Sequence, residues 1–229
     1  MKNKHFFKLI RKAIVGALLI TTTAPVLAAN SFTANSFTAN ADYTAKYGSN
    51  AQVRLDRLNV LMAKHANSPI ETKLIVVNDF FNEFFYREDS VLWGQDDYWA
   101  SLIEFLGVGM GDCEDYAIAK LEVLTRMGVD KEKLRLIYTT ANGITPHMVL
   151  GYYSNQSTRP LIMDNIQNKV LPMSVRADLK LVYSFNDTGI WVIVNGKSKF
   201  AGNSKRLSLW GDVNTRTAMR LPTENYKII

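Results

Sequence analysis

The sequence predicts an α+β fold, in which N-terminal helices pack on an antiparallel β-sheet. Helical spacing of apolar residues dominates the chain up to Gly128, and apolar-polar alternation dominates after it. The dipeptides Asn142-Gly143 and Asn195-Gly196 separate the later segments and favour tight hairpins between antiparallel strands. Helices followed by hairpin-linked strands are typical of the α+β class.

Residues 1–28 have the pattern of a secretory signal. Basic residues without any acid fill residues 1–12, an apolar run covers 13–20, and the small-residue pattern Val26-Leu27-Ala28-Ala29 follows. The apolar run is shorter than the roughly 20 residues that a membrane-spanning helix needs. We therefore predict cleavage after Ala28 or Ala29, a periplasmic mature protein, and no membrane insertion after cleavage.

Removal of the signal changes the charge of the chain. It takes five of the 27 basic residues and none of the 21 acidic ones, so the net charge falls from +6 to +1. A nearly neutral mature protein gives no support for a nucleic-acid partner. Residues 29–42, which contain a tandem Asn-Ser-Phe-Thr-Ala repeat, are predicted to be a disordered leader, and residues 43–229 one domain.

Three helices are predicted before the sheet. The first covers residues 53–62 and ends near Pro69, and the second runs from Pro69 to about residue 84. Residues 87–99, rich in aspartate and tryptophan, are expected to form a loop. The third helix covers residues 112–127, with Asp112 as N-cap and Gly128 as C-terminal cap. An aromatic stripe in the second helix is expected to pack in the core; it comprises Phe80, Phe81, Phe84 and Phe85.

Strands are predicted from the alternation after Gly128. They cover residues 134–139, 147–153, 161–165 and 190–194. The second and third of these strands are successive, so an antiparallel pairing of the two is expected.

Cys113 is the only cysteine and falls at the first position of the third helix. The free N–H groups and the positive end of the helix dipole favour a thiolate there. Its neighbours Asp112, Glu114 and Asp115 oppose ionisation, because like charges raise the pKa of the thiol. A bound Ca²⁺ would neutralise these hard oxygen donors, although helix capping without a metal is the commoner cause of an acidic first turn.

His147 and Asp164 lie on successive predicted strands, 17 positions apart. An antiparallel pairing could bring the two side chains together beneath the helix that carries Cys113. Thiol catalysis needs a nucleophile, an imidazole that moves its proton, and a carboxylate that orients the imidazole. Taken singly, His147 could be a structural residue and Asp164 a turn former.

These residues belong to segments that resemble the bacterial transglutaminase-like cysteine proteinases of the LapG type, from about residue 43 to the end. The segments are Asp97-Tyr98-Trp99-Ala100, Gly111-Asp112-Cys113-Glu114-Asp115-Tyr116-Ala117, His147-Met148-Val149-Leu150 and Met163-Asp164-Asn165. The resemblance implies a papain-like or transglutaminase-like core, with Cys113 as nucleophile, His147 as general base and acid, and Asp164 as orienting residue. It also implies Asp112, Glu114 and Asp115 as ligands of Ca²⁺.

The resemblance further implies a biological role. Proteins of this type are periplasmic, calcium-dependent endopeptidases that cut the N-terminal region of a large surface adhesin and so release cells from biofilms. An inner-membrane LapD-like receptor for cyclic di-GMP sequesters and inhibits them. Three alternatives remain open from the sequence: a transglutaminase-type acyltransferase, a cell-wall peptidase, and a non-catalytic periplasmic binding module.

Overall fold

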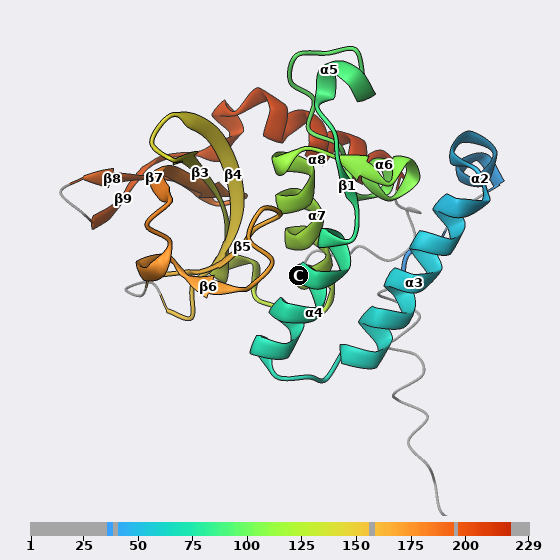
Figure 1. Ribbon diagram of the computed structural model, residues 1–229, viewed down its shortest axis with the longest axis horizontal. Coiled ribbons are helices and arrows are strands. Elements are labelled where there is room, and N and C mark those ends of the chain that lie inside the picture. The colour runs from blue at the N-terminus through green and yellow to red at the C-terminus, as the bar shows by residue number, and fades with distance from the viewer. Residues whose placement is uncertain (1–35, 39–40, 156–158, 195–196, 221–229) are drawn as a thin grey trace, which may run out of the picture.

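The computed structural model describes residues 36–38, 41–155, 159–194 and 197–220, so the predicted signal lies outside the described residues (Figure 1). The helices are α2 (Ala41–Tyr47), α3 (Ser49–His65), α4 (Ile70–Asn82), α5 (Asp89–Leu92), α6 (Leu102–Val108), α7 (Cys113–Arg126) and α8 (Ser208–Arg220). The strands are β1 (Phe85–Tyr86), β2 (Met110–Gly111), β3 (Leu134–Ala141), β4 (Thr145–Tyr152), β5 (Leu161–Met163), β6 (Leu171–Pro172), β7 (Leu179–Asn186), β8 (Gly189–Val194) and β9 (Lys197–Gly202).

The helices come first and the sheet follows, which confirms the predicted α+β class. Seven strands form one antiparallel sheet in the order β6-β5-β4-β3-β7-β8-β9. Figure 1 shows this sheet on one side of the molecule and helices α3, α4 and α6 on the other, with α7 between the two. The strand β7 was not predicted. It pairs with β3, so that β3 lies at the centre of the sheet between β4 and β7.

Two antiparallel hairpins form where the Asn-Gly dipeptides predict them. Asn142 and Gly143 have φ values of 50° and 80°, which fit the left-handed turn that joins β3 to β4. The strands β8 and β9 also pair as a hairpin, although its turn residues lie outside the described ranges.

The helical layer is built from the predicted apolar stripes. Leu58 of α3 and Leu74 and Phe81 of α4 are fully buried in the main core. Phe85 departs from the prediction and is 75% exposed, because α4 ends at Asn82 and Phe85 belongs to the short strand β1. The predicted loop at residues 87–99 contains the one-turn helix α5.

The helix α7 is the centre of the fold. It packs against α4 on one side and against β4 and β3 on the other. Gly111 precedes it and has no room for a side chain, because a Cβ atom there would lie 2.4 Å from a carboxylate oxygen of Asp115. At the other end Gly128 adopts φ 82°, the left-handed conformation of a helix C-terminal cap.

Part of the predicted leader belongs to the packed fold. Phe37 is only 4% exposed, and its ring lies 3.9 Å from the guanidinium carbon of Arg126. Its backbone N–H and C=O bond the side-chain amide of Asn59, at 2.9 and 2.8 Å. Phe37, the aromatic residue of the second repeat copy, is therefore part of the core. The prediction that residues 29–42 are a disordered leader does not hold for Phe37.

No helix within the described ranges is long and apolar enough to cross a membrane.

Candidate active site

Cys113 is the first residue of α7 and is half-buried. Its Sγ donates a hydrogen bond to Oε2 of Glu114 at 2.9 Å and receives one from the backbone N–H of Met148. Burial, and after it the charge of Glu114, raise the pKa of the thiol. Desolvation and the neighbouring carboxylate thus outweigh the effect of the helix N-terminus, and Cys113 is a thiol in this arrangement.

His147 and Asp164 are in direct contact. Nε2 of His147 and Oδ1 of Asp164 are 2.9 Å apart, and both side chains are buried. The antiparallel pairing of β4 with β5 produces this contact, because His147 lies near the start of β4 and Asp164 directly follows β5. With Nε2 bonded to the carboxylate, Nδ1 is the nitrogen left for a reacting group.

Cys113 contacts the backbone of Met148, the residue that follows His147 in β4. Among the described residues, its Sγ is hydrogen-bonded to Glu114 and to the Met148 backbone rather than to the imidazole. The packing of α7 on β4 therefore brings Cys113 against the residue that follows His147, with the thiol turned toward Glu114.

Asp164 is held by more than the imidazole. Nη2 of Arg176 lies 2.6 Å from its Oδ2, and the backbone N–H of Ile166 donates to its Oδ1 at 3.0 Å. Burial acts to raise the pKa of Asp164, but the hydrogen bonds from His147, Ile166 and Arg176 outweigh it and lower the pKa to about 2. The carboxylate is therefore ionised at every physiological pH.

Replacement of Arg176 by methionine is expected to destabilise the fold by about 3 kcal/mol at neutral pH, because a buried carboxylate would lose its cation. The free energy of unfolding, measured with urea, tests this. Since the folded pKa of Asp164 lies below the unfolded value, the stability that its ionised form provides is present above about pH 4 and is lost as the pH falls toward 2. The difference between wild type and variant should shrink over that interval.

Asp178 offers the matched control for this experiment. It bonds the same guanidinium, with Nη2–Oδ2 at 2.6 Å, but its side chain is 46% exposed. Because water replaces an exposed partner, Asp178→Asn should change stability by no more than about 1 kcal/mol. An equal loss of unfolding free energy in both variants would show that Arg176 acts through its contact with Asp178, and not by balancing the buried charge of Asp164.

A cluster of three carboxylates lies beside Cys113. Asp89, Asp112 and Asp115 each offer an oxygen atom within 4.8 Å of the others. Asp115 is already used, since it accepts the backbone N–H of Ala100 at 2.7 Å and that of Asp112 at 3.3 Å. The Oδ1 atoms of Asp89 and Asp112 are buried and have no partner among the described residues.

This cluster suits a hard divalent cation. Burial, and after it the charges of Glu114 and Asp115, raise the pKa of Asp112 to about 9. Burial likewise raises the pKa values of Asp89 and Asp115. Carboxylate oxygens that lie close together, two of them buried without a donor among the described residues, are hard ligands of the kind that Ca²⁺ prefers. The cluster contains Asp112 and Asp115 of the predicted ligands but has Asp89 in the place of Glu114.

Sequence reasoning missed two residues of this region. Asp89 belongs to the aspartate-rich segment that was assigned to a loop, and only the folding of that segment brings it to the N-terminus of α7. Arg176 follows the one-turn segment Met173–Val175 and carries no sequence signal, because nothing in its neighbours indicates that it pairs with Asp164.

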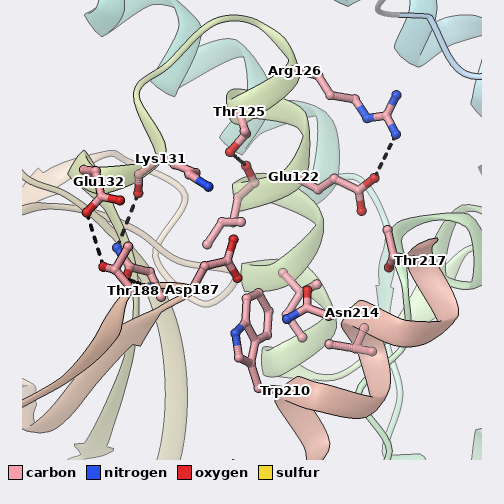
Figure 2. Close-up of a pocket in the computed structure, with 14 residues that line it drawn as sticks. Glu122, Thr125, Arg126, Lys131, Glu132, Asp187, Thr188, Trp210, Asn214 and Thr217 are labelled. Carbon is pink, nitrogen blue, oxygen red and sulfur yellow. Dashed lines mark hydrogen bonds and ion pairs between the residues drawn. The ribbon is translucent and has the colours of Figure 1, made fainter. Parts of the chain in front are cut away.

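The described pocket of about 210 Å³ lies elsewhere (Figure 2). It is lined by the C-terminal half of α7, the β7–β8 turn and α8, with Trp210 at its apolar side and the Glu122–Arg126 pair, 3.4 Å apart, at its edge. None of the candidate catalytic or metal-binding residues lines it, so it is not the candidate active site.

The chain was compared with known families and proteins. Residues 35–199 match the family model described as bacterial transglutaminase-like cysteine proteinase. The match begins at residue 35, so the second copy of the pentapeptide repeat lies inside it. Comparison with curated proteins gives no match.

Solved structures of one bacterial protein are similar to this chain over most of its length. Legionella pneumophila LapG, EGTA-treated, is 34% identical, with a TM-score of 0.68 and coverage of 82% of this chain and 96% of that chain. A second structure of the same protein gives 34% identity and a TM-score of 0.67. The calcium-bound form is 35% identical, with a TM-score of 0.67 and coverage of 77% and 96%.

Proposed function

Because this chain belongs to the bacterial transglutaminase-like cysteine proteinases, we propose that it is a calcium-dependent endopeptidase with a Cys113-His147-Asp164 triad. We further propose that it works in the periplasm, cuts the N-terminal region of a large surface adhesin and so promotes release from biofilms. The observation that carries the catalytic part is the buried His147–Asp164 pair at the end of α7 where the only cysteine begins the helix.

In the proposed mechanism the Cys113 thiolate attacks a peptide carbonyl. Nδ1 of His147 takes the thiol proton and gives it to the departing amine, and the same imidazole then assists water in hydrolysing the thioester. Asp164 fixes the imidazole through Nε2 and stabilises its protonated form. The backbone N–H of Cys113, in the first turn of α7, has no partner within its own helix and is suited to donate to the oxyanion.

Asp89, Asp112 and Asp115 are the residues proposed to hold calcium. The unpartnered Oδ1 atoms of Asp89 and Asp112 are suited to bind the ion directly, while Asp115 joins the cluster to the backbone of Ala100. When bound, Ca²⁺ would supply the positive charge that offsets these carboxylates and lowers the pKa of the neighbouring thiol. The existence of a calcium-bound form of Legionella pneumophila LapG supports calcium as the ion.

Glu114 connects the cluster to the nucleophile. Its carboxylate accepts a hydrogen bond from the Cys113 thiol in this structure, and its charge raises the pKa values of both Cys113 and Asp112. A turn of Glu114 toward the cluster would add a fourth carboxylate there and release the thiol. The set of Ca²⁺ ligands expected from the sequence, Asp112, Glu114 and Asp115, stays a prediction.

Exposed apolar side chains lie close in the chain or in strand pairing to all three candidate catalytic residues and favour a polypeptide substrate. Tyr86, 56% exposed, pairs in β1–β2 with Gly111, two residues before Cys113. Ile144 and Ile166, also exposed, lie three residues before His147 and two residues after Asp164. Exposed apolar residues on three segments that each carry a candidate catalytic residue favour a surface that binds protein.

The same exposed surface is available to an inhibitory partner. We propose that an inner-membrane LapD-like receptor for cyclic di-GMP binds the protease, as the family resemblance implies. The predicted export signal supports a meeting in the periplasm, where such a receptor could reach the protein.

An adhesin-cleavage assay tests the proposed function. The protein is incubated with N-terminal fragments of candidate surface adhesins, with calcium and with EGTA. We expect one or two cuts in calcium and none in EGTA, with the cleavage sites identified by mass spectrometry. A test amine added to the same mixture identifies an acyltransferase, since incorporation of the amine without hydrolysis would contradict an endopeptidase.

A further inference from the structure

Lys120 is a buried cation that the catalytic proposal leaves unused. It lies on α7, two turns beyond Cys113 and on the same face of the helix, and its exposed fraction is 0%. Within the described residues no carboxylate forms an ion pair with it; its Nζ is hydrogen-bonded to the neutral amides of Asn78 and Asn82 and lies 5.7 Å from the centre of the Tyr116 ring. Burial lowers the pKa of Lys120 to about 7, and the charges of Asp164 and Asp79 oppose this only in part. A buried lysine without a directly bonded carboxylate is costly to the fold, so stability alone does not explain it.

The lysine determines which way the two amides face. Nζ donates to Oδ1 of Asn78 at 2.9 Å and to Oδ1 of Asn82 at 2.8 Å. Because an amine has at least two N–H groups in either protonation state, both bonds remain when the lysine is neutral. Both amide oxygens are therefore turned toward Lys120, and both NH₂ groups point away from it.

The NH₂ groups bind the loop that begins with the triad carboxylate. Nδ2 of Asn82 donates to the backbone oxygen of Asp164 at 2.8 Å and lies 3.1 Å from Oδ1 of Asn168. Nδ2 of Asn78 donates to the backbone oxygen of Asn168 at 2.7 Å. The β5–β6 connection, which reaches toward α4 and α7 in Figure 1, is thus held at both of its ends.

We propose that Lys120 is a positioning residue for Asp164, acting through Asn82 and Asn78. This rests on the proposed function, in which Asp164 orients His147. Arg176 and Ile166 hold the carboxylate of Asp164, whereas Lys120 fixes its backbone through the two amides. The helix that presents the nucleophile thereby also determines the position of the carboxylate at the other end of the triad.

Asn82→Asp separates this role from general packing. The new carboxylate keeps an acceptor for Lys120 and adds an ion pair, but it has no donor for the Asp164 carbonyl. We expect kcat for adhesin-fragment cleavage to fall about tenfold with KM within about twofold, and the thermal midpoint to stay near that of the wild type. Lys120→Met, which removes both donors, should lower kcat at least as much.

Lys73→Met is the matched control. Lys73 lies on α4 and donates to the backbone oxygen of Met127, just beyond the end of α7, at 2.7 Å, so it joins the same two helices without touching the loop. We expect its kcat to equal that of the wild type. An equal loss of kcat in Lys73→Met, or wild-type kcat in both Asn82→Asp and Lys120→Met, would overturn the proposal.

A second measurement keeps the inference separate from the proposed function. In the proposed triad the rate at which iodoacetamide alkylates Cys113 depends on the imidazole but not on any substrate, so it should fall about tenfold in Asn82→Asp and not in Lys73→Met. If wild-type protein cleaves no adhesin fragment, the proposed substrate is wrong, while the alkylation rates still decide the role of Lys120. Unchanged alkylation in Asn82→Asp contradicts it.

Discussion

Replacement of Cys113 by alanine is expected to abolish adhesin cleavage while the protein stays folded. No other cysteine exists to replace the nucleophile, and loss of a catalytic nucleophile costs about four orders of magnitude or more in rate. The fold should be little affected, because Cys113 is half-buried at the first position of α7 and, in the part of the chain that the structure describes, its thiol bonds only Glu114 and the Met148 backbone. Cleavage assays and thermal unfolding, run on the same preparation, measure both outcomes.

Cys113→Ser provides the control for shape at this position. Serine keeps a donor for Glu114 and nearly the same volume, but its hydroxyl is a far weaker nucleophile than a thiolate. It should therefore be as inactive as the alanine variant and as stable as the wild type. Cleavage retained by either variant would contradict a cysteine mechanism.

Asp89→Asn is expected to change the stability of the protein in opposite directions with and without calcium. In EGTA the variant should be at least as stable as the wild type, because it removes one of three carboxylates that repel one another. In calcium it should be less stable and less active, because calcium affinity depends strongly on the number of charged ligands. A ligand at 100 times its Kd stabilises the wild type by about 2.7 kcal/mol, which a thermal midpoint easily detects.

Asp96→Asn is the matched control for the metal site. Asp96 lies in the same aspartate-rich segment as Asp89 but is exposed and outside the carboxylate cluster. Its midpoint and activity should respond to calcium as the wild type does. Identical calcium responses of Asp89→Asn and the wild type, in calorimetry and in unfolding, would exclude Asp89 as a ligand.

Local patterns predicted much of the fold. The spacing of apolar residues in α3, α4 and α7 and the Asn142-Gly143 turn depend on neighbours a few positions apart, and the structure has these elements close to the predicted bounds. The strand β7 was missed, since its position beside β3 depends on pairing with a segment about 45 residues earlier. Phe37 was missed because its burial depends on Asn59 and Arg126, far along the chain.

Some residues of the candidate site could likewise be predicted from the sequence, and others could not. The sequence by itself determined Cys113, its helix-start position and the acidic residues around it, because these are properties of one short segment. The order of His147 and Asp164 on successive strands also indicated their contact.

Only the tertiary structure decided which charges offset one another. It brings Asp89 to the acidic cluster, Arg176 to Asp164, and Lys120 to the amides of α4. It also shows that burial outweighs the helix dipole at Cys113. The physical reason is that a pKa depends on desolvation and on charges within a few ångströms, and these are determined by packing between segments far apart in the sequence.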